Sequence, residues 1–187
     1  RLDRELLDEM PPGLFAPKRG GRDDGHPHVY LGTENYCDEE LERLGKSHRY
    51  ASLETLVREL SARGIRQAHH FIVANAETSV GNLMENLSKI ARLEREFAPA
   101  YGVLKPPISH LVSFYPSPNY KLMRLKGLLA QVELRGTLSA KGFLEFDYPL
   151  AQRDIPLDPD VRELAERIPG WCRDADWGQV LSAAEGY

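Results

Sequence analysis

Hydrophobic and polar positions along residues 29–120 form one pattern that occurs three times. Each unit starts with an apolar strand, continues through a short polar segment and ends in an amphipathic helix. The strands are expected at 29–31, 70–74 and 108–114. Units of this kind build parallel sheets and barrels, in which ligands bind at the carboxyl ends of the strands. We therefore expect three neighbouring parallel strands, with the polar segment after each strand at a shared hollow.

Helices are indicated where apolar residues recur three and four positions apart. The clearest helix has four such residues on one face and lies between an N-cap at Ser52 and a terminating Gly64; the four are Leu53, Leu56, Val57 and Leu60. The other helices are expected at 39–44 after an N-cap at Asp38, at 80–97 after a cap at Thr78 or Ser79, at 121–133, and at 159–168 with Pro159 in the first turn.

The expected domain organisation places these units between two further segments. Residues 1–28 are a leading helix and polar loop, 29–133 are the three βα units, and 134–187 are a C-terminal extension. The leading helix, over 1–10, has its leucines on one face, which indicates a helix whose upstream context has been removed. The extension is expected to contain a strand over 143–148. Two tryptophans are expected to anchor it to the body, Trp171 and Trp177.

Composition narrows the classes of function. The hydrophobic fraction of 42% is ordinary for a globular chain. The formal net charge of −4 gives no support to a nucleic-acid partner, because phosphate binding favours a basic face. The apolar stretches are far shorter than the roughly 20 residues that cross a bilayer, so no membrane partner is expected. The cysteines, Cys37 and Cys172, form no CxxC pattern, which favours a reducing, cytoplasmic setting.

The histidines do not predict a metal site. His69 and His70 are adjacent on an expected strand, so they point to opposite faces and cannot bind one ion together. His26 and His28 fall in the expected loop, away from the strands. We therefore predict no metal ligands among these side chains.

Three segments carry a resemblance to a known protein family. They are LGTENYCDEELERLGKSHRYASLETLVRELSARGI, HHFIVANAETSVGNLMENL and ISHLVSFYPSPNY. Together they resemble the second half of the radical S-adenosylmethionine (SAM) superfamily. The resemblance implies an α/β fold, a partial (βα) barrel of about three parallel βα units with a C-terminal α/β tail.

The same resemblance implies which residues contact SAM. All of them lie at strand ends, and they form three groups: Gly32 and Glu34, beside the methionine or ribose; Asn75, Ala76, Glu77 and Thr78, beside the ribose and adenine; and Tyr115, Pro116, Pro118 and Tyr120, at the adenine edge.

Each of these assignments has a plainer alternative. A carboxylate at Glu34 or Glu77 also stabilises the start of the following helix through the helix dipole. Asn75 can simply accommodate a tight turn. The proline-containing segment 115–118 can be a rigid turn without a ligand.

The cysteine count limits the chemistry of this chain. Enzymes of the superfamily hold a 4Fe–4S cluster with a CxxxCxxC motif, whose three thiolates leave one iron open for SAM. This chain has no such motif, and two cysteines are too few to hold a cubane. We therefore expect SAM and a 4Fe–4S cluster as cofactors of a parent enzyme, in which a missing N-terminal half is the partner of this chain. The chain alone is expected to be inactive, and its substrate is unknown.

Two other interpretations stay open. One is a non-catalytic α/β binding or interaction module that has kept the fold and lost the cluster. The other, a flavodoxin-like or Rossmann-like domain, is disfavoured because no Gly-rich phosphate loop follows any strand. An open half barrel would also leave edge strands at 29–31 and 108–114, which are expected to form a dimer or to be covered by the strand at 143–148.

Overall fold

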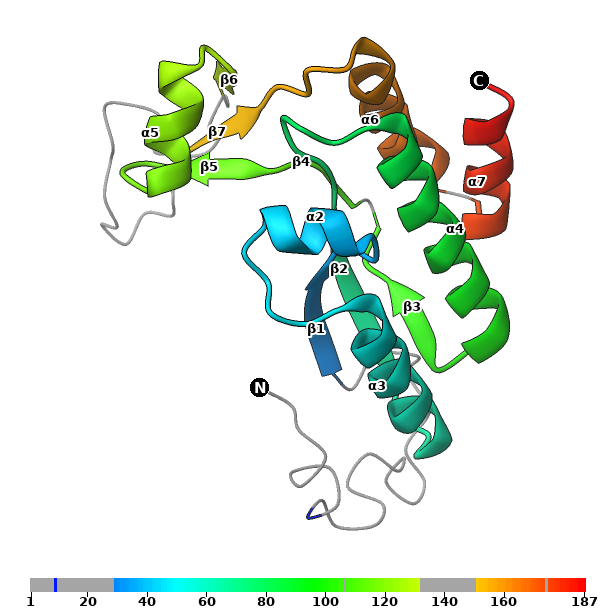
Figure 1. The fold of residues 1–187 in the computed structure, drawn as a ribbon. Helices are drawn as coiled ribbons and strands as arrows, with labels where there is room; N and C mark the ends of the chain where they lie inside the picture. The colour runs from blue at the N-terminus through cyan, green and yellow to red at the C-terminus, as the bar shows by residue number, and fades with distance from the viewer. Residues whose placement is uncertain (1–8, 10–28, 106, 132–150, 174) are drawn as a thin grey trace, which may run out of the picture.

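A computed structural model describes residues 9, 29–105, 107–131, 151–173 and 175–187 (Figure 1). Its elements in chain order are β1 (Val29–Glu34), α2 (Asp38–Arg43), α3 (Tyr50–Ala62), β2 (Gln67–Ala74), α4 (Val80–Phe97), β3 (Tyr101–Val103), β4 (Ile108–His110), β5 (Val112–Phe114), α5 (Pro118–Leu125), β6 (Leu129–Gln131), β7 (Ala151–Asp154), α6 (Pro159–Trp171) and α7 (Trp177–Glu185).

The centre of the fold is a parallel sheet around β2. Strand β1 pairs parallel with β2, with Val29 beside Gln67. On β2, the first half pairs parallel with β3 and the last residues pair parallel with β4, where His110 lies beside Ala74. The chain is therefore an α/β fold with three successive parallel passes, as the repeat predicts.

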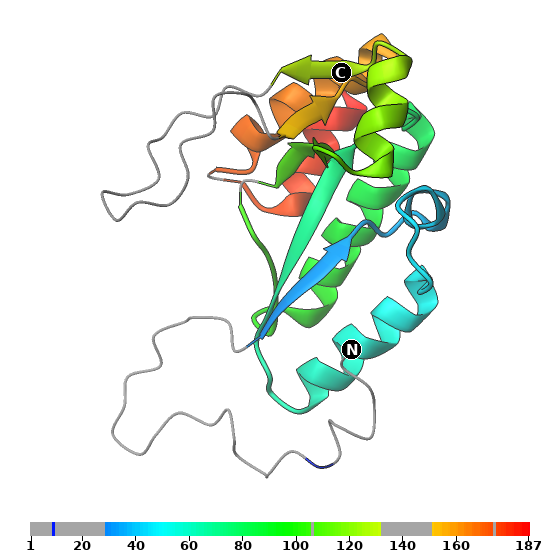
Figure 2. The same cartoon turned by 90° about the vertical axis from the view of Figure 1, so that its left-hand side faces the viewer.

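Helices α3 and α4 lie on the same face of β1 and β2 (Figure 2). Toward these helices β2 presents four side chains that are at most 2% exposed, namely Gln67, His69, Phe71 and Val73. On the opposite face of β2, His70 and Ile72 are only half-buried. Tyr30, which pairs with Ala68 on that face, is 64% exposed. Helices α3 and α4 thus cover one face of the sheet, while the other face is half-buried at His70 and Ile72 and buried at Ala74 and His110, where α6 contacts β2 and β4.

The C-terminal helices complete the hydrophobic core. α6 and α7 pack into the same cluster as α4, and Trp177 is fully buried. The Trp177 backbone N–H also donates to the Glu94 carboxylate at 2.7 Å, which joins α7 to α4. Trp177 therefore anchors the tail as expected, and Trp171 packs half-buried against the same cluster.

Most expected helix boundaries agree with the structure to within a few residues. Ser79 is the N-cap of α4 and accepts from the Asn82 backbone N–H, and Gly64 follows α3 with φ +68°. α6 begins at Pro159, as predicted. Ser52 is not the N-cap of α3, because that helix starts at Tyr50; its hydroxyl instead accepts from the Arg49 N–H.

The expected strand over 108–114 is wrong beyond His110. At Leu111 the chain changes partner: the Leu111 N–H donates to Ala74 O, and Leu111 O accepts from the Asp154 N–H, each at 2.8 Å. β5 then runs antiparallel to β7, with Phe114 beside Ala151. Phe114 is therefore not the end of a third parallel strand.

The expected helix over 121–133 is also too long. α5 ends at Leu125, and Leu129–Gln131 form β6, antiparallel to β7. The physical reason is Gly127, whose φ of +67° lets the chain turn so that the Leu128 N–H caps Met123 O at 2.9 Å.

Several expectations fall outside the described residues. These are the loop over 11–28, the strand over 143–148, and the helix over 1–10 apart from Glu9. Among the described strands, none pairs with the outer edge of β1. In the described parts of the chain, no helix has the length and apolar character needed to cross a membrane.

Candidate functional site

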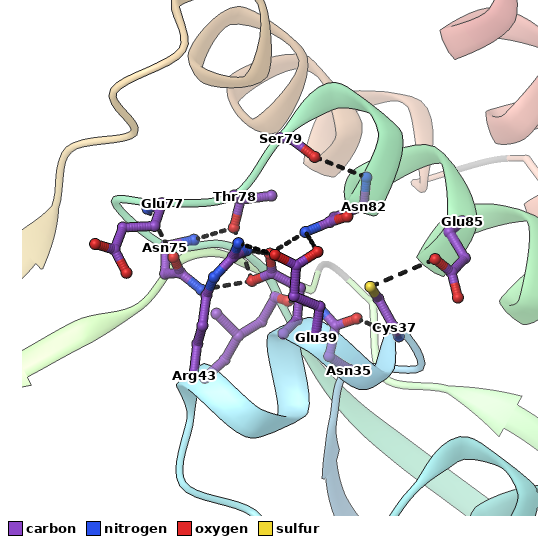
Figure 3. Close-up of polar contacts among 12 residues, drawn as sticks. Asn35, Cys37, Glu39, Arg43, Asn75, Glu77, Thr78, Ser79, Asn82 and Glu85 are labelled. Atoms are coloured by element: carbon purple, nitrogen blue, oxygen red, sulfur yellow. Dashed lines mark hydrogen bonds and ion pairs between the residues drawn. The ribbon is translucent and has the colours of Figure 1, made fainter.

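A buried carboxylate lies where α2 meets the end of β2. Glu40, on α2, is 1% exposed. Its Oε2 accepts from Asn75 Nδ2 at 2.5 Å and from Thr78 Oγ1 at 2.9 Å. Its Oε1 accepts from Arg43 Nη1 at 2.5 Å and from Asn82 Nδ2 at 3.0 Å. Figure 3 shows these donors converging from the turn after β2, from α4 and from α2.

The four donors compensate the buried charge. The Arg43 guanidinium supplies an opposite charge, and the amide and hydroxyl groups supply charge-assisted hydrogen bonds. We call Glu40, Arg43, Asn75, Thr78 and Asn82 the Glu40 cluster. Because its members come from α2, α4 and the turn between β2 and α4, the cluster holds α2 over the ends of the strands.

The turn after β2 is shaped by the same side chains that the sequence singles out. Asn75 Oδ1 accepts from the Glu77 N–H at 2.8 Å, and Thr78 Oγ1 accepts from the Asn75 N–H at 2.9 Å. Asn75 and Thr78 thus fix this turn and bind Glu40 at the same time. Ala76 is buried in the turn, and its carbonyl accepts from the Leu157 N–H at 2.9 Å.

Glu34 ends β1 in a rare backbone conformation. Its φ is +67°, the only positive value at a non-glycine residue in the described chain. The Asn35 N–H donates to Thr33 O at 2.8 Å across it, which closes a tight three-residue turn. The Glu34 side chain is 21% exposed and lies 3.2 Å from Lys46 Nζ. Its carboxylate is therefore partly accessible beside the Lys46 ammonium group, with exposed Gly32 next to it.

The third group of expected residues lies at the start of α5. Tyr115 and Tyr120 make an edge-to-face contact with ring centroids 5.4 Å apart, and Tyr120 is buried. The Tyr115–Pro116 bond is cis, and Pro118 begins α5. Glu77 reaches this region, because its carboxylate lies 3.7 Å from Nζ of Lys126 at the end of α5.

The structure thus brings some of the expected residues together. Asn75 and Thr78 meet at Glu40, and Glu77 connects their turn to α5. Gly32 and Glu34 lie at the end of the neighbouring strand, where the Glu34 carboxylate pairs with Lys46.

Sequence reasoning missed the central member of the cluster. Glu40 lies in a run of three acidic residues in the first turn of a short helix, which resembles ordinary helix-dipole stabilisation. Its partners Asn75, Thr78 and Asn82 are 35 to 42 residues away in sequence. No local pattern identifies such a contact.

A second polar group missed from the sequence joins the small antiparallel sheet to α5. Ser113 Oγ donates to Asp154 Oδ1 at 2.6 Å and accepts from Asn119 Nδ2 at 2.7 Å. Burial raises the pKa of Asp154 above its usual value. Beside this group is an open hollow of about 320 Å³, lined by Tyr120, Arg124, Gly127, Leu129 and Gln152.

His69 is a core histidine. Its Nε2 lies 3.0 Å from Gln67 Oε1, which can only accept, so Nδ1 is the acceptor for the Thr33 hydroxyl at 2.6 Å. Burial lowers the pKa of His69 to about 3 and that of His110 to about 4, which keeps both rings neutral at pH 7. Within the described residues, no group of three or more His, Cys, Asp or Glu side chains is arranged to hold a metal ion.

The chain matches no protein-family model, no curated protein and no solved structure.

Proposed function

We propose that this chain supplies the C-terminal part of a radical SAM enzyme and contributes one wall of its SAM site. The supporting observation is the winding of the sheet. β1, β2 and the β3–β4 pass follow one another in parallel, while α3 and α4 cover one face (Figure 2). In a βα barrel the helices that connect successive strands all lie on the outer face of the sheet, because the other face of every strand points into the barrel. A doubly wound sheet places helices on both faces.

The strand ends fit a SAM molecule in part. The Glu34 carboxylate is partly accessible and can accept hydrogen bonds from ribose hydroxyls or from the SAM ammonium group in addition to its pair with Lys46. The pair Tyr115 and Tyr120 would offer an aromatic edge for the adenine, but it follows the antiparallel strand β5 and not a parallel strand end, and Tyr120 is buried. Asn75 and Thr78 contribute through the shape of their turn, because their side chains already bind Glu40.

The residues of this chain do not fit an iron–sulfur cluster. Cys37 and Cys172 are both buried and lie in different parts of the sequence. Three thiolates are needed to hold a cubane with one open iron. In this proposal the cluster therefore belongs to a preceding part of the same polypeptide, where it would enable bound SAM to supply the adenosyl group for radical chemistry.

A second candidate is a non-catalytic α/β interaction module. The observation that favours it is the Glu40 cluster, because two of the expected ligand side chains are used to hold the fold together. In that case the strand ends are structural, and Glu34 has no ligand.

The coding sequence that precedes Arg1 tests the proposal directly. Three further βα units place a CxxxCxxC motif roughly 100–150 residues upstream. The protein that includes this region should take up iron and sulfide anaerobically and cleave SAM. The 187-residue chain alone should form no cluster.

Variants at Glu34 then test the site. In the longer protein, Glu34→Gln should lower SAM affinity about tenfold, the loss of one charge-assisted hydrogen bond, and leave the cluster absorbance unchanged. Glu42→Gln, on a side chain of α2 that is 74% exposed, is the matched control. A natural protein that starts near Arg1, or SAM binding that is insensitive to Glu34, would favour the interaction module.

A further inference from the structure

Helix α5 has apolar side chains on two opposite sides. Tyr120 and Met123 face inward and are buried, whereas Leu122 and Leu125 are 47% and 87% exposed. Each exposed leucine is two positions from a buried residue, which is about 200° around the helix axis. Leu122 and Leu125 are three positions apart and so share one outer face. This outer apolar face has no counterpart in an ordinary surface helix, whose solvent side is polar.

Basic and aromatic residues are also exposed on this helix and just before it. Phe114 is 63% exposed, whereas the Tyr115 ring packs against buried Tyr120 on the inner side of α5. Lys121 and Arg124 flank the leucines on the helix and are exposed. The sequence contains no Asp or Glu between Glu96 and Glu133, although the whole chain has a net charge of −4. We call Phe114, Lys121, Leu122, Arg124 and Leu125 the α5 patch.

The α5 patch lies on a projecting part of the molecule. In Figure 1, α5 and the β5–β7–β6 sheet extend away from α3, α4 and α7. Among the described residues, helices α3, α4 and α7 therefore do not stand between the patch and a large, flat partner.

We propose that the α5 patch binds the surface of an anionic lipid bilayer. Exposed leucine and phenylalanine side chains can enter the region between headgroups and acyl chains, and Lys and Arg attract anionic headgroups. The exposed leucines, Leu122 and Leu125, argue against a nucleic-acid partner, because nucleic-acid bases stack on aromatic or guanidinium planes. A second copy of the chain would place like charges against each other. The expectation of no membrane partner rested on the length of apolar stretches, which bears on spanning a bilayer and not on contact with its surface.

Vesicle flotation tests this inference independently of the proposed SAM site. The 187-residue chain should float with vesicles that contain phosphatidylglycerol and not with phosphatidylcholine alone, and added salt should weaken the binding. Leu125→Glu should reduce the partition coefficient roughly tenfold or more, because it removes the leucine side chain that would enter the bilayer and adds a charge that anionic headgroups repel. Lys121→Gln and Arg124→Gln should each reduce it about fivefold.

The matched control is Leu157→Glu, which changes an equally apolar and 57% exposed residue outside the patch. It should leave vesicle binding unchanged. Binding that survives Leu125→Glu, or that heparin alone reproduces, would overturn the proposal. So would dimerisation of the chain that Leu125→Glu abolishes, because the patch would then join two copies. A large drop in the melting temperature of Leu125→Glu would show that the chain itself covers the leucine, which also overturns the proposal.

Discussion

At the scale of single residues, Glu40 shows how a buried charge can organise a strand end. One carboxylate accepts four hydrogen bonds from side chains on α2, α4 and the turn after β2. Removing a partner from such a group leaves donors buried without an acceptor, and this costs more than the intact group contributes.

Glu40→Ala should therefore lower the free energy of unfolding by about 3 kcal/mol or more. Urea denaturation monitored by circular dichroism measures the change. Glu42→Ala removes a carboxylate of the same helix that is 74% exposed and pairs with Arg49, and it should cost less than about 1 kcal/mol. Similar losses for the two variants would show that the hydrogen bonds to Glu40 contribute little.

His69 predicts a pH dependence of stability. Its pKa is lowered by burial from 6.5 to about 3 in the folded chain, so the unfolded chain binds a proton more readily. The stabilisation from neutral His69 is complete above pH 6.5 and is lost as the pH falls toward 3. His69→Gln should reduce the slope of unfolding free energy against pH by about 1.4 kcal/mol per pH unit between about pH 4 and pH 6. An unchanged slope in pH-dependent urea denaturation would contradict the burial of a neutral ring.

At the scale of elements, the turn from β1 to α2 carries backbone strain. A φ of +67° is costly for any residue with a Cβ and costs glycine nothing. The same turn presents the Glu34 carboxylate to Lys46. A strained residue at a strand end is a reason to suspect function, because strain persists only where the surrounding structure maintains it.

Replacing Glu34 by glycine or alanine separates the strain from the ion pair. Both variants lack the carboxylate, but Glu34→Gly should be more stable than Glu34→Ala by about 1 kcal/mol, because only glycine relaxes at this φ. Thermal unfolding measures the difference. At Tyr30, within the strand, the order should reverse, since glycine weakens a strand interior. The same order at both positions would mean that Glu34 is not strained.

At the scale of the whole molecule, local signals predicted the elements better than their partners. Gly64, Ser79 and Pro159 mark helix ends through backbone rules that act within a few residues, and the structure agrees with them. The apolar pattern over 108–114 continues through Leu111 and contains no sign of which strand lies beside it. The sequence pattern therefore did not predict that the pairing partner changes from β2 to β7 within this segment, because the partner strands lie about 40 positions away.

In the candidate site, too, the sequence identified individual residues but not the contacts that they make. The resemblance selected Asn75 and Thr78, which do lie at a strand end, but their partner Glu40 depends on tertiary packing. Glu34 was selected for its carboxylate, and the structure adds its unusual backbone and its ion pair with Lys46.

The position of Leu111 limits which insertions and deletions the fold tolerates. Its N–H belongs to the parallel sheet and its carbonyl to the antiparallel one, so a single residue separates β4 from β5. Adding or deleting one residue there would turn Ser113 to the other side of its strand and separate its hydroxyl from Asp154. Relatives that share this fold should conserve the spacing between these strands more strictly than the side chains within them.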